Sequence, residues 1–218
     1  MNLNIKKSIS AFLCISALLG CSQPQASSTP TPEVTPTTEP TEAPSSEATS
    51  SKVLIAYFSR ADENYNVGTI EEGNTYKVAK EIQEVTGGDL FEIQTTYAYP
   101  ASYDECIEVA KQEQADNARP ELKQQVENFE QYDEIYLGYP IWWGDMPMVV
   151  YTFLEAYDFS GKTIHPFNTH EGSGVSGMNQ TIANLVPNAT VTESPAIRGS
   201  VAQNEPETVK QEVANWIK

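Results

Sequence analysis

From residue 52 onward, short apolar segments alternate with amphipathic ones, and this alternation limits the fold more than any other feature of the chain. The first apolar segment, Val53 to Phe58, is unbroken, as in a parallel strand that is covered on both faces. The next segment, 74–86, has helical spacing and is followed by Gly87, a residue type that commonly ends helices. Its apolar face holds Val78, Ala79, Ile82 and Val85. A strand followed by a helix in this way is the unit from which parallel sheets are built.

The same alternation continues to the end of the chain. Strands are predicted over 90–95, 135–139, 163–167 and 190–197, the last of them broken at Pro195. Helices are predicted from the capping-box pattern of Ser102 and Glu105, over 147–154 and 178–186, and from Pro206 onward. This order predicts an α/β fold, a doubly wound parallel sheet with helices on both faces and right-handed crossovers. Ligands of such sheets bind at the carboxyl ends of the strands, so the loops after the first, third and fourth strands form the candidate site.

The start of the chain has the pattern of an export signal. Lys6 and Lys7 precede an apolar run over 9–19. That run has about half of the roughly 20 residues that a membrane-spanning helix needs, so a signal peptide is predicted at 1–20.

The signal ends at a cysteine and is followed by a polar segment. Residues 18–21, Leu-Leu-Gly-Cys, resemble the lipobox of bacterial lipoproteins, which implies cleavage before Cys21 and a lipid on its sulfur. An ordinary secretory signal is the alternative. Residues 21–51 are rich in Pro, Thr, Ser and Glu, a composition that predicts a disordered tether. We therefore expect an exported lipoprotein, held at the bacterial cell envelope by a lipid anchor and facing outward, with one folded domain at 52–218.

Charge and cysteine content exclude two classes of function. The formal net charge is −17, so nucleic acid is not an expected partner, because phosphates are bound through Lys and Arg. Cys106 is the only cysteine after residue 21, which excludes a disulfide or a cysteine metal cluster within the domain. The two histidines, His165 and His170, do not suffice for a transition-metal site.

Each of the three candidate loops allows two interpretations, a purely structural one and a ligand-binding one. Ser59 and Arg60 follow the first strand, and Gly73, Asn74 and Thr75 open a helix whose N-terminus suits a phosphate; an ordinary capped helix is the alternative. The loop after the third strand contains Pro140, Ile141, Trp142, Trp143 and Gly144, where indole rings either stack on a planar ligand or cap the core. The loop after the fourth strand contains Thr169, His170, Gly172, Ser173 and Gly174, which either present backbone amides to a ligand or form a flexible loop. The motif GxxxxGK[ST] of nucleotide triphosphate sites is absent, and so is the GxGxxG fingerprint of dinucleotide-binding sites.

Together, and in this order, the Tyr-Phe-Ser, Gly-Asn-Thr, Tyr-Pro-Ile-Trp-Trp and Thr-His-Glu-Gly-Ser-Gly segments resemble the flavodoxin family over 52–218. The resemblance implies five parallel strands in the order 2-1-3-4-5 and a bound FMN. It also implies that Ser59, Asn74, Thr75 and, less directly, Arg60 hold the phosphate. The isoalloxazine would lie between the segments 140–144 and 169–174. The stretch from Arg60 to Gly73 is longer than in short-chain flavodoxins. With Asp62, Glu63, Asn64 and Tyr65 it could fold over the ribityl chain or over a partner site, and its residues have no individual assignment.

Three functions follow from this resemblance. The first is FMN-dependent electron transfer to or from an envelope partner. Residues 52–218 contain 26 acidic and 11 basic residues, and this negative charge would lower the reduction potential of the flavin. The second is an NAD(P)H-dependent quinone or flavin-type oxidoreductase, such as those that place a second substrate at a homodimer interface. The third is a binding or scaffold lipoprotein without flavin. The fold alone does not decide between the first two.

Overall fold

The computed structural model describes residues 52–218, so the predicted signal peptide, Cys21 and the tether lie outside the described residues. Its parallel sheet has the order β4-β1-β5-β6-β7, and β8 pairs with β6 beyond the end of β7. The strands are β1 (Lys52–Tyr57), β4 (Asp89–Glu92), β5 (Tyr132–Pro140), β6 (Thr163–His170), β7 (Thr190–Val191) and β8 (Ala196–Arg198). Because β7 and β8 are two pieces of one broken strand, the predicted order 2-1-3-4-5 and the break at Pro195 are both confirmed.

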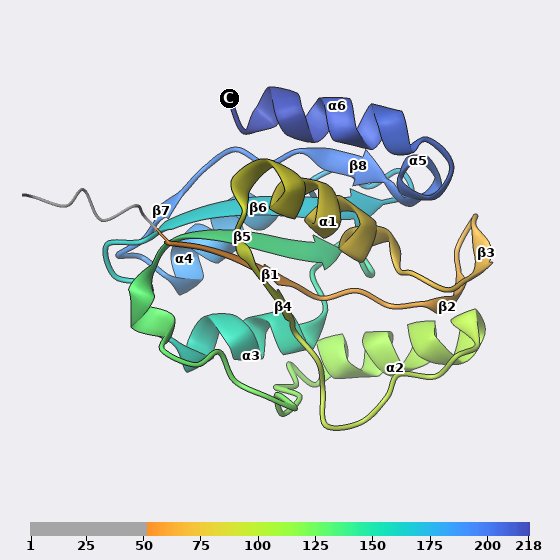
Figure 1. Cartoon of the computed structure of the whole chain (residues 1–218). Coiled ribbons are helices and arrows are strands. Elements are labelled where there is room, and N and C mark those ends of the chain that lie inside the picture. The colour runs from red at the N-terminus through yellow and green to blue at the C-terminus, as the bar shows by residue number, and fades with distance from the viewer. Residues whose placement is uncertain (1–51) are drawn as a thin grey trace, which may run out of the picture. The chain divides into compact units, whose positions relative to one another are not determined.

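Helices cover both faces of the sheet, as Figure 1 shows. One face carries α1 (Asn74–Thr86), the short α5 (Gly199–Asn204) and α6 (Pro206–Trp216). The other carries α3 (Met148–Ala156) and α4 (Met178–Leu185), with the short 3-10 turn η1 (Phe129–Gln131). Helix α2 (Tyr103–Ala115) lies beside α3. Among residues 52–218, no helix combines the length and the apolar character that a membrane span requires.

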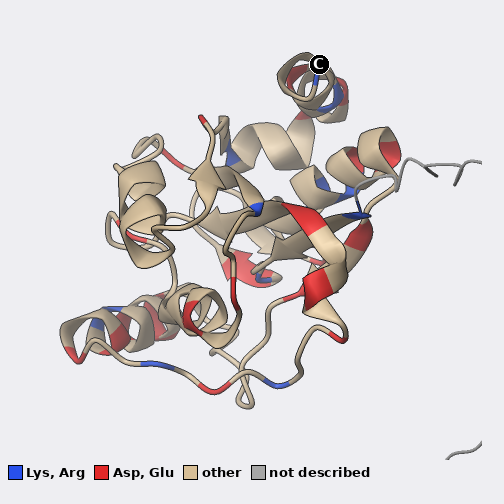
Figure 2. Ribbon diagram, turned by 90° about the vertical axis from the view of Figure 1, so that its left-hand side faces the viewer, with Lys and Arg blue, Asp and Glu red and all other residues tan. Residues whose placement is uncertain are grey.

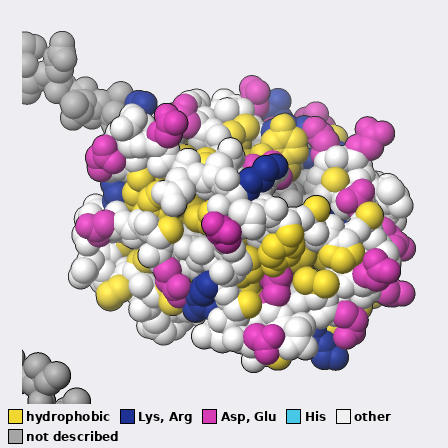
Figure 3. Space-filling view, turned by 90° about the horizontal axis from the view of Figure 1, so that it is seen from below, with side chains coloured by type: hydrophobic (Ala, Val, Ile, Leu, Met, Phe, Trp, Pro, Cys, Tyr) yellow, Lys and Arg dark blue, Asp and Glu magenta, His cyan; other side chains and the backbone are white. Residues whose placement is uncertain are grey.

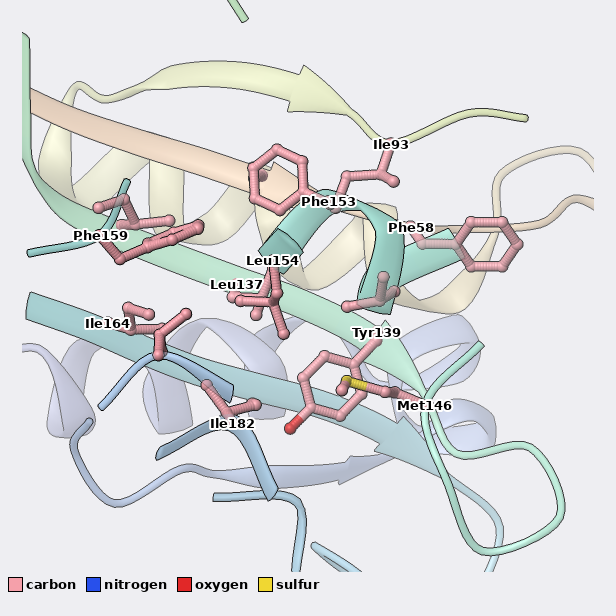
Figure 4. Packing of buried hydrophobic residues seen from close by; sticks show 14 of the residues in the cluster. Phe58, Ile93, Leu137, Tyr139, Met146, Phe153, Leu154, Phe159, Ile164 and Ile182 are labelled. Atoms are coloured by element: carbon pink, nitrogen blue, oxygen red, sulfur yellow. The ribbon is translucent and has the colours of Figure 1, made fainter. Parts of the chain in front are cut away.

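The two faces have separate apolar cores, which explains the unbroken apolar run of β1. Leu54 and Ala56 point into the core beneath α3 and α4, and Ile55 and Tyr57 point into the core beneath α1 and α6. Figure 4 shows side chains of the first core meeting between sheet and helices. Each fully buried Leu or Ile side chain contributes roughly 1.5–3 kcal/mol to the stability of the fold relative to an exposed one. A polar residue at any of these inward-facing positions of β1, on either face, would therefore destabilise the sheet.

A hairpin occupies the long stretch after β1 that the sequence left unassigned. β2 (Asp62–Asn64) and β3 (Gly68–Ile70) pair in antiparallel fashion between β1 and α1. In Figure 1 the hairpin lies beyond the carboxyl ends of the sheet strands, close to the start of α2. It was not predicted, because its two three-residue strands are mostly exposed and carry no apolar alternation.

Three local predictions are corrected. Val85 does not share the buried face of α1; it lies in the last turn of the helix and is 47% exposed. The strand predicted over 90–95 ends at Glu92. Ser102 precedes α2 but makes no side-chain capping bond. The N–H of Tyr103 donates instead to the carboxylate of Glu63, at 2.9 Å.

Acidic side chains are distributed around the whole domain rather than gathered on one element. Figure 2, which looks along the sheet, shows Asp and Glu on helices and loops of both layers and fewer Lys and Arg. Figure 3 shows hydrophobic side chains exposed between acidic ones on the face seen from below. A basic partner would therefore be attracted from several directions.

Candidate functional site

A cavity of about 270 Å³ lies where the three predicted loops meet at the carboxyl ends of the strands. Nine of the predicted site residues border it: Arg60, Asn74, Pro140, Ile141, Trp142, Trp143, Thr169, His170 and Ser173. Seven residues that were not predicted complete its wall: Asn64, Tyr65, Tyr103, Cys106, Ile107, Ala110 and Glu171. The other predicted residues, Ser59, Thr75, Gly144, Gly172 and Gly174, lie in the same loops but do not line it.

The first loop approaches the start of α1 very closely at Gly73. A Cβ there would lie nearer than 3.0 Å to Ser59 Oγ and to the carbonyl of Arg60. Ser59 Oγ in turn accepts the N–H of Tyr76 at 3.0 Å, so it caps α1 from a distance in sequence. A helix begins with unpaired N–H groups and a partial positive charge, which leaves the amides around Asn74 suited to an anion.

Thr75 links the first loop to the third rather than facing the cavity. Its hydroxyl is 2.8 Å from the hydroxyl of Thr169, and both residues are buried. This hydrogen bond holds the start of α1 against the end of β6, so the two predicted binding segments are joined directly.

Arg60 is engaged by backbone carbonyls. Its guanidinium donates to the carbonyls of Glu63 at 2.6 Å, Pro100 at 2.6 Å and Ala101 at 2.7 Å. The planar fork of Arg suits such an arrangement, which ties the hairpin to the segment before α2. Arg60 therefore lines the cavity without offering a free guanidinium to a phosphate.

The second loop makes a tight turn that projects Trp143. Trp142 N–H donates to the carbonyl of Asp145 at 2.7 Å, and Asp145 N–H donates back at 3.0 Å. Trp143 and Gly144 both have positive φ, 52° and 80°, as a type I′ turn requires. A bulky residue in this conformation is strained. The indole N–H of Trp143 donates to the carbonyl of Ile107 at 2.9 Å, which holds the ring in place although it is 52% exposed.

The two tryptophans have different surroundings. Trp142 packs edge-on against Phe58 and Tyr99, with ring centroids 5.3 Å apart in each pair. It therefore fits the core-capping interpretation, although one edge reaches the cavity. Trp143 fits the other interpretation, because half of its surface is exposed at the cavity, where a planar ligand could stack; the Nζ of Lys111 lies over the ring, 5.5 Å from its centroid.

His170 fixes the third loop. Its Nδ1 accepts the N–H groups of Gly172 at 2.9 Å and Gly174 at 3.1 Å, and its Nε2 lies 3.3 Å from the carbonyl of Ala196. This pattern requires a neutral ring with the proton on Nε2. The amides of Gly172 and Gly174 are thus used within the loop, and Ser173 between them is the residue that reaches the cavity.

A comparison with protein families identifies the family of the chain. A family model described as flavodoxin matches residues 52–218. The chain belongs to the flavodoxin family. A protein from Bacteroides uniformis, described as a flavoprotein, is 30% identical, with a TM-score of 0.61 over 75% of this chain and 98% of that one. A second, from Bacteroides eggerthii, is 26% identical, with a TM-score of 0.61 over 78% of this chain and 99% of that one.

A third similar structure contains a cofactor. The flavoprotein of Lactobacillus acidophilus, solved in complex with FMN, is 21% identical, with a TM-score of 0.54 over 78% of this chain and all of that one. At this identity the likeness concerns the flavodoxin fold. Among curated proteins no match is found.

Glu171 lies within the predicted segment 169–174 of this flavodoxin, but the sequence did not single it out as a site residue. Its carboxylate accepts the N–H of Ser200 at 2.5 Å and the side-chain amide of Asn66 at 3.3 Å, and it lies 3.6 Å from a guanidinium nitrogen of Arg198. It therefore joins the hairpin tip, the third loop and the start of α5. Its place in the Thr-His-Glu-Gly-Ser-Gly segment was the sequence signal, and its individual role could not be predicted because its partners are distant along the chain.

A polar cluster supports the cavity wall behind Trp142. The phenol of Tyr99 donates to Glu113 at 2.8 Å, and the phenol of Tyr97 donates to the other oxygen of that carboxylate. Burial raises the pKa of Tyr97 to about 12, and burial also raises the pKa of Tyr99 strongly, so both phenols remain protonated donors. Burial likewise raises the pKa of the Cys106 thiol, which keeps this cavity-lining residue uncharged and weakly nucleophilic.

Proposed function

We propose that residues 52–218 bind FMN in the cavity and carry electrons for a partner at the cell envelope. The observation that carries the proposal is the convergence of two different features on one cavity. One is a helix start with neutral donors for a phosphate, and the other is the exposed, fixed ring of Trp143. The FMN of the Lactobacillus acidophilus flavoprotein supports the choice of ligand.

The phosphate end of FMN would lie at the start of α1. Gly73 permits the close approach there, Ser59 orders the first turn, and Asn74 reaches the cavity. Thr75 contributes through its backbone, because its hydroxyl is bonded to Thr169. Neutral donors at a helix N-terminus are sufficient for a phosphate, so Arg60 is not needed as a ligand.

The isoalloxazine would lie between the segments 140–144 and 169–174. The apolar wall formed by Ile107, Ala110 and Ile141 excludes water from one side, and Trp143 offers a ring for stacking. Bound FMN supplies one- or two-electron redox chemistry, and the protein tunes its potential. The nearby carboxylate of Glu171 and the acidic surface disfavour a negative charge on the reduced ring, which lowers that potential.

Envelope anchoring is part of the same proposal. The lipobox-like sequence at Cys21 and the polar segment up to residue 51 support a lipid anchor and a tether that holds the domain outside the membrane. The excess of acidic side chains favours a redox partner with a basic surface. This partner would be a membrane or envelope protein within reach of the tether.

Titration of the full chain with FMN, followed by flavin fluorescence, tests the cofactor assignment. Trp143→Ala is expected to weaken FMN binding by about two- to tenfold, because a stacked aromatic pair contributes roughly 0.5–1.5 kcal/mol. The matched control is Val85→Ala, which removes an exposed apolar side chain outside the cavity and leaves the affinity unchanged. A Trp143→Ala variant with wild-type affinity would contradict the assignment of the ring. An FMN-loaded chain that reoxidises in two separate one-electron steps would support the carrier function, and rapid oxidation of NADH would contradict it.

A further inference from the structure

Three oxidisable aromatic side chains form a continuous series from the candidate flavin cavity to the surface. Trp142 borders that cavity, and its ring centroid lies 5.3 Å from that of Tyr99. The ring of Tyr99 lies in turn 5.5 Å from the ring of Tyr97, which is 43% exposed. The series therefore begins where the flavin would bind and ends in solvent.

The exposed end of the series lies in a second cavity. Tyr97 and Tyr99 both line this cavity, whose volume is about 460 Å³. Arg60 is the one residue that it shares with the first cavity, so the two are separate spaces. A volume of this size is sufficient for a small molecule. A small molecule in the second cavity would therefore contact the tyrosines without displacing a flavin from the first.

A single buried carboxylate accepts the hydroxyl protons of both tyrosines. Tyr99 donates to one oxygen of Glu113 at 2.8 Å, and Tyr97 donates to the other oxygen. Glu113 is only 9% exposed, and it borders a small cleft together with Trp142. A phenol that loses an electron becomes a strong acid, so a tyrosine is oxidised most readily where a base already accepts its hydroxyl hydrogen. Both tyrosines of the series meet this condition.

We propose that Trp142, Tyr99 and Tyr97 form an electron-transfer path that carries single electrons from a small reductant in the second cavity to the flavin cavity. The inference rests on the proposed FMN binding for the source of the oxidant, which is the light-excited oxidised flavin. Such a path would protect the site, because the electron vacancy left by the oxidant is filled from solution instead of remaining on Trp142.

The protons balance at Glu113. Trp142 gives one electron to the oxidant and becomes a radical cation, which takes an electron from Tyr99 while the phenolic proton passes to Glu113. The Tyr99 radical then takes an electron from Tyr97 and regains a proton from Glu113, and the proton of Tyr97 replaces it on the carboxylate. An enediol such as ascorbate gives one electron to the Tyr97 radical, Glu113 returns the proton, and the oxidised enediol releases its own proton to solvent. In sum, one electron passes from the enediol to the oxidant.

The first test uses the full chain without FMN, so that it does not depend on the cofactor. Its background variant combines Trp143→Phe with Trp216→Phe, which leaves Trp142 as the only tryptophan in the chain. A pulse of azide radicals oxidises tryptophan in preference to tyrosine, and the optical bands of the indolyl and phenoxyl radicals are followed in time. The Trp142 radical is expected to convert to a phenoxyl radical at a rate that is independent of protein concentration.

Substitutions in this background separate a path from a purely structural cluster. Tyr99→Phe keeps the ring but loses the oxidisable hydroxyl, so the conversion is expected to disappear. Glu113→Gln keeps an acceptor but is a far weaker base, so the conversion should slow. In Tyr97→Phe the conversion should remain, but ascorbate should quench the radical more slowly, because Tyr99 is less exposed than Tyr97. Tyr157→Phe is the matched control, because this half-buried phenol lies outside the series and accepts the N–H of Val126 at 2.7 Å.

The azide experiment has two results that overturn the proposal. A conversion as fast in Tyr99→Phe as in the background refutes the path, and if circular dichroism shows that this variant is unfolded, Glu113→Gln takes its place with the same criterion. Quenching by ascorbate that is unchanged in Tyr97→Phe refutes the connection to the second cavity.

The second test loads the full chain with FMN and excites it with a blue flash. A phenoxyl radical is expected by electron paramagnetic resonance in the wild type and not in Tyr99→Phe. If the chain does not bind FMN, the proposed function fails, and the azide experiment still decides whether the path conducts. If FMN binds and the flash gives no phenoxyl radical, the path is refuted while FMN binding stands.

Discussion

Replacing Gly73 with alanine tests the close contact on which the phosphate end of the site depends. The φ angle of Gly73 is −65°, which any residue adopts, so the substitution adds one methyl group and no backbone strain. That methyl group would lie nearer than 3.0 Å to Ser59 Oγ and to the carbonyl carbon and oxygen of Arg60. Two of these three atoms belong to the backbone, so a side-chain rotation alone does not relieve the contact.

The cost follows from what has to move. Forcing an extra methyl group into a filled space costs roughly 1–3 kcal/mol. Displacing Ser59 also breaks its hydrogen bond from Tyr76 N–H, which contributes about 0.5–1.5 kcal/mol. Because the two effects share the same displacement, we expect the free energy of unfolding to fall by about 2–3 kcal/mol in total. FMN affinity should fall at least about tenfold, since the α1 amides no longer converge.

Urea unfolding of the FMN-free chain and fluorescence titration with FMN measure the two effects. Gly87→Ala is the matched control at the other end of α1, where φ is 68° and no atom lies within 4 Å of the added Cβ. It should lose about 1–2 kcal/mol of stability through backbone strain, with FMN affinity unchanged. If Gly73→Ala binds FMN as wild type does, the close-contact argument is wrong. If both variants lose affinity equally, the effect belongs to the stability of α1 rather than to the phosphate site.

Two further predictions concern the histidines. His170→Ala leaves the N–H groups of Gly172 and Gly174 without their acceptor, so the free energy of unfolding should fall by about 1–3 kcal/mol and FMN binding should weaken. His170→Gln, whose side-chain oxygen can accept such bonds, should recover part of the affinity, and equal loss in both variants would contradict the role of Nδ1. Burial lowers the pKa of His165 below 6.5 despite the neighbouring Glu134, so unfolding takes up a proton in acid and stability should decrease as pH falls below about 6.5. Thermal unfolding from pH 7 to pH 5 should show a smaller decrease in His165→Gln, and identical pH profiles would refute this origin.

The parts of the fold that the sequence predicted well are those in which local pattern and burial agree. The helix over 74–86 and its end at Gly87 are confirmed to the residue, because apolar spacing and a left-handed glycine define its limits. The break in the last strand follows from Pro195, which has no N–H for a sheet hydrogen bond. The three loops converge because parallel strands end at the same edge of the sheet.

The features that escaped prediction depend on contacts between distant residues. The carboxylate of Glu63 displaces the expected cap of α2, and the hydroxyl of Thr75 turns inward to Thr169; neither contact has a local sequence signal. Aromatic pattern alone also did not separate Trp142 from Trp143. Their difference arises from the type I′ turn, which directs one ring into the core and the other outward.

The β2–β3 hairpin connects the start of α1, where the phosphate would bind, with Tyr65 on the cavity wall. The carbonyl of Arg60 is one of the two groups that a Cβ at Gly73 would strike, and the same carbonyl accepts a hydrogen bond from the side-chain amide of Asn64, the residue before Tyr65. Any movement of this peptide therefore shifts both the first turn of α1 and Tyr65. If the loop between β1 and α1 were short, as in short-chain flavodoxins, its residues would contact only the phosphate. Here a single peptide group connects the first turn of α1 to the position of Tyr65, so substitutions at Gly73 and Tyr65 should not be additive in their effects on FMN affinity.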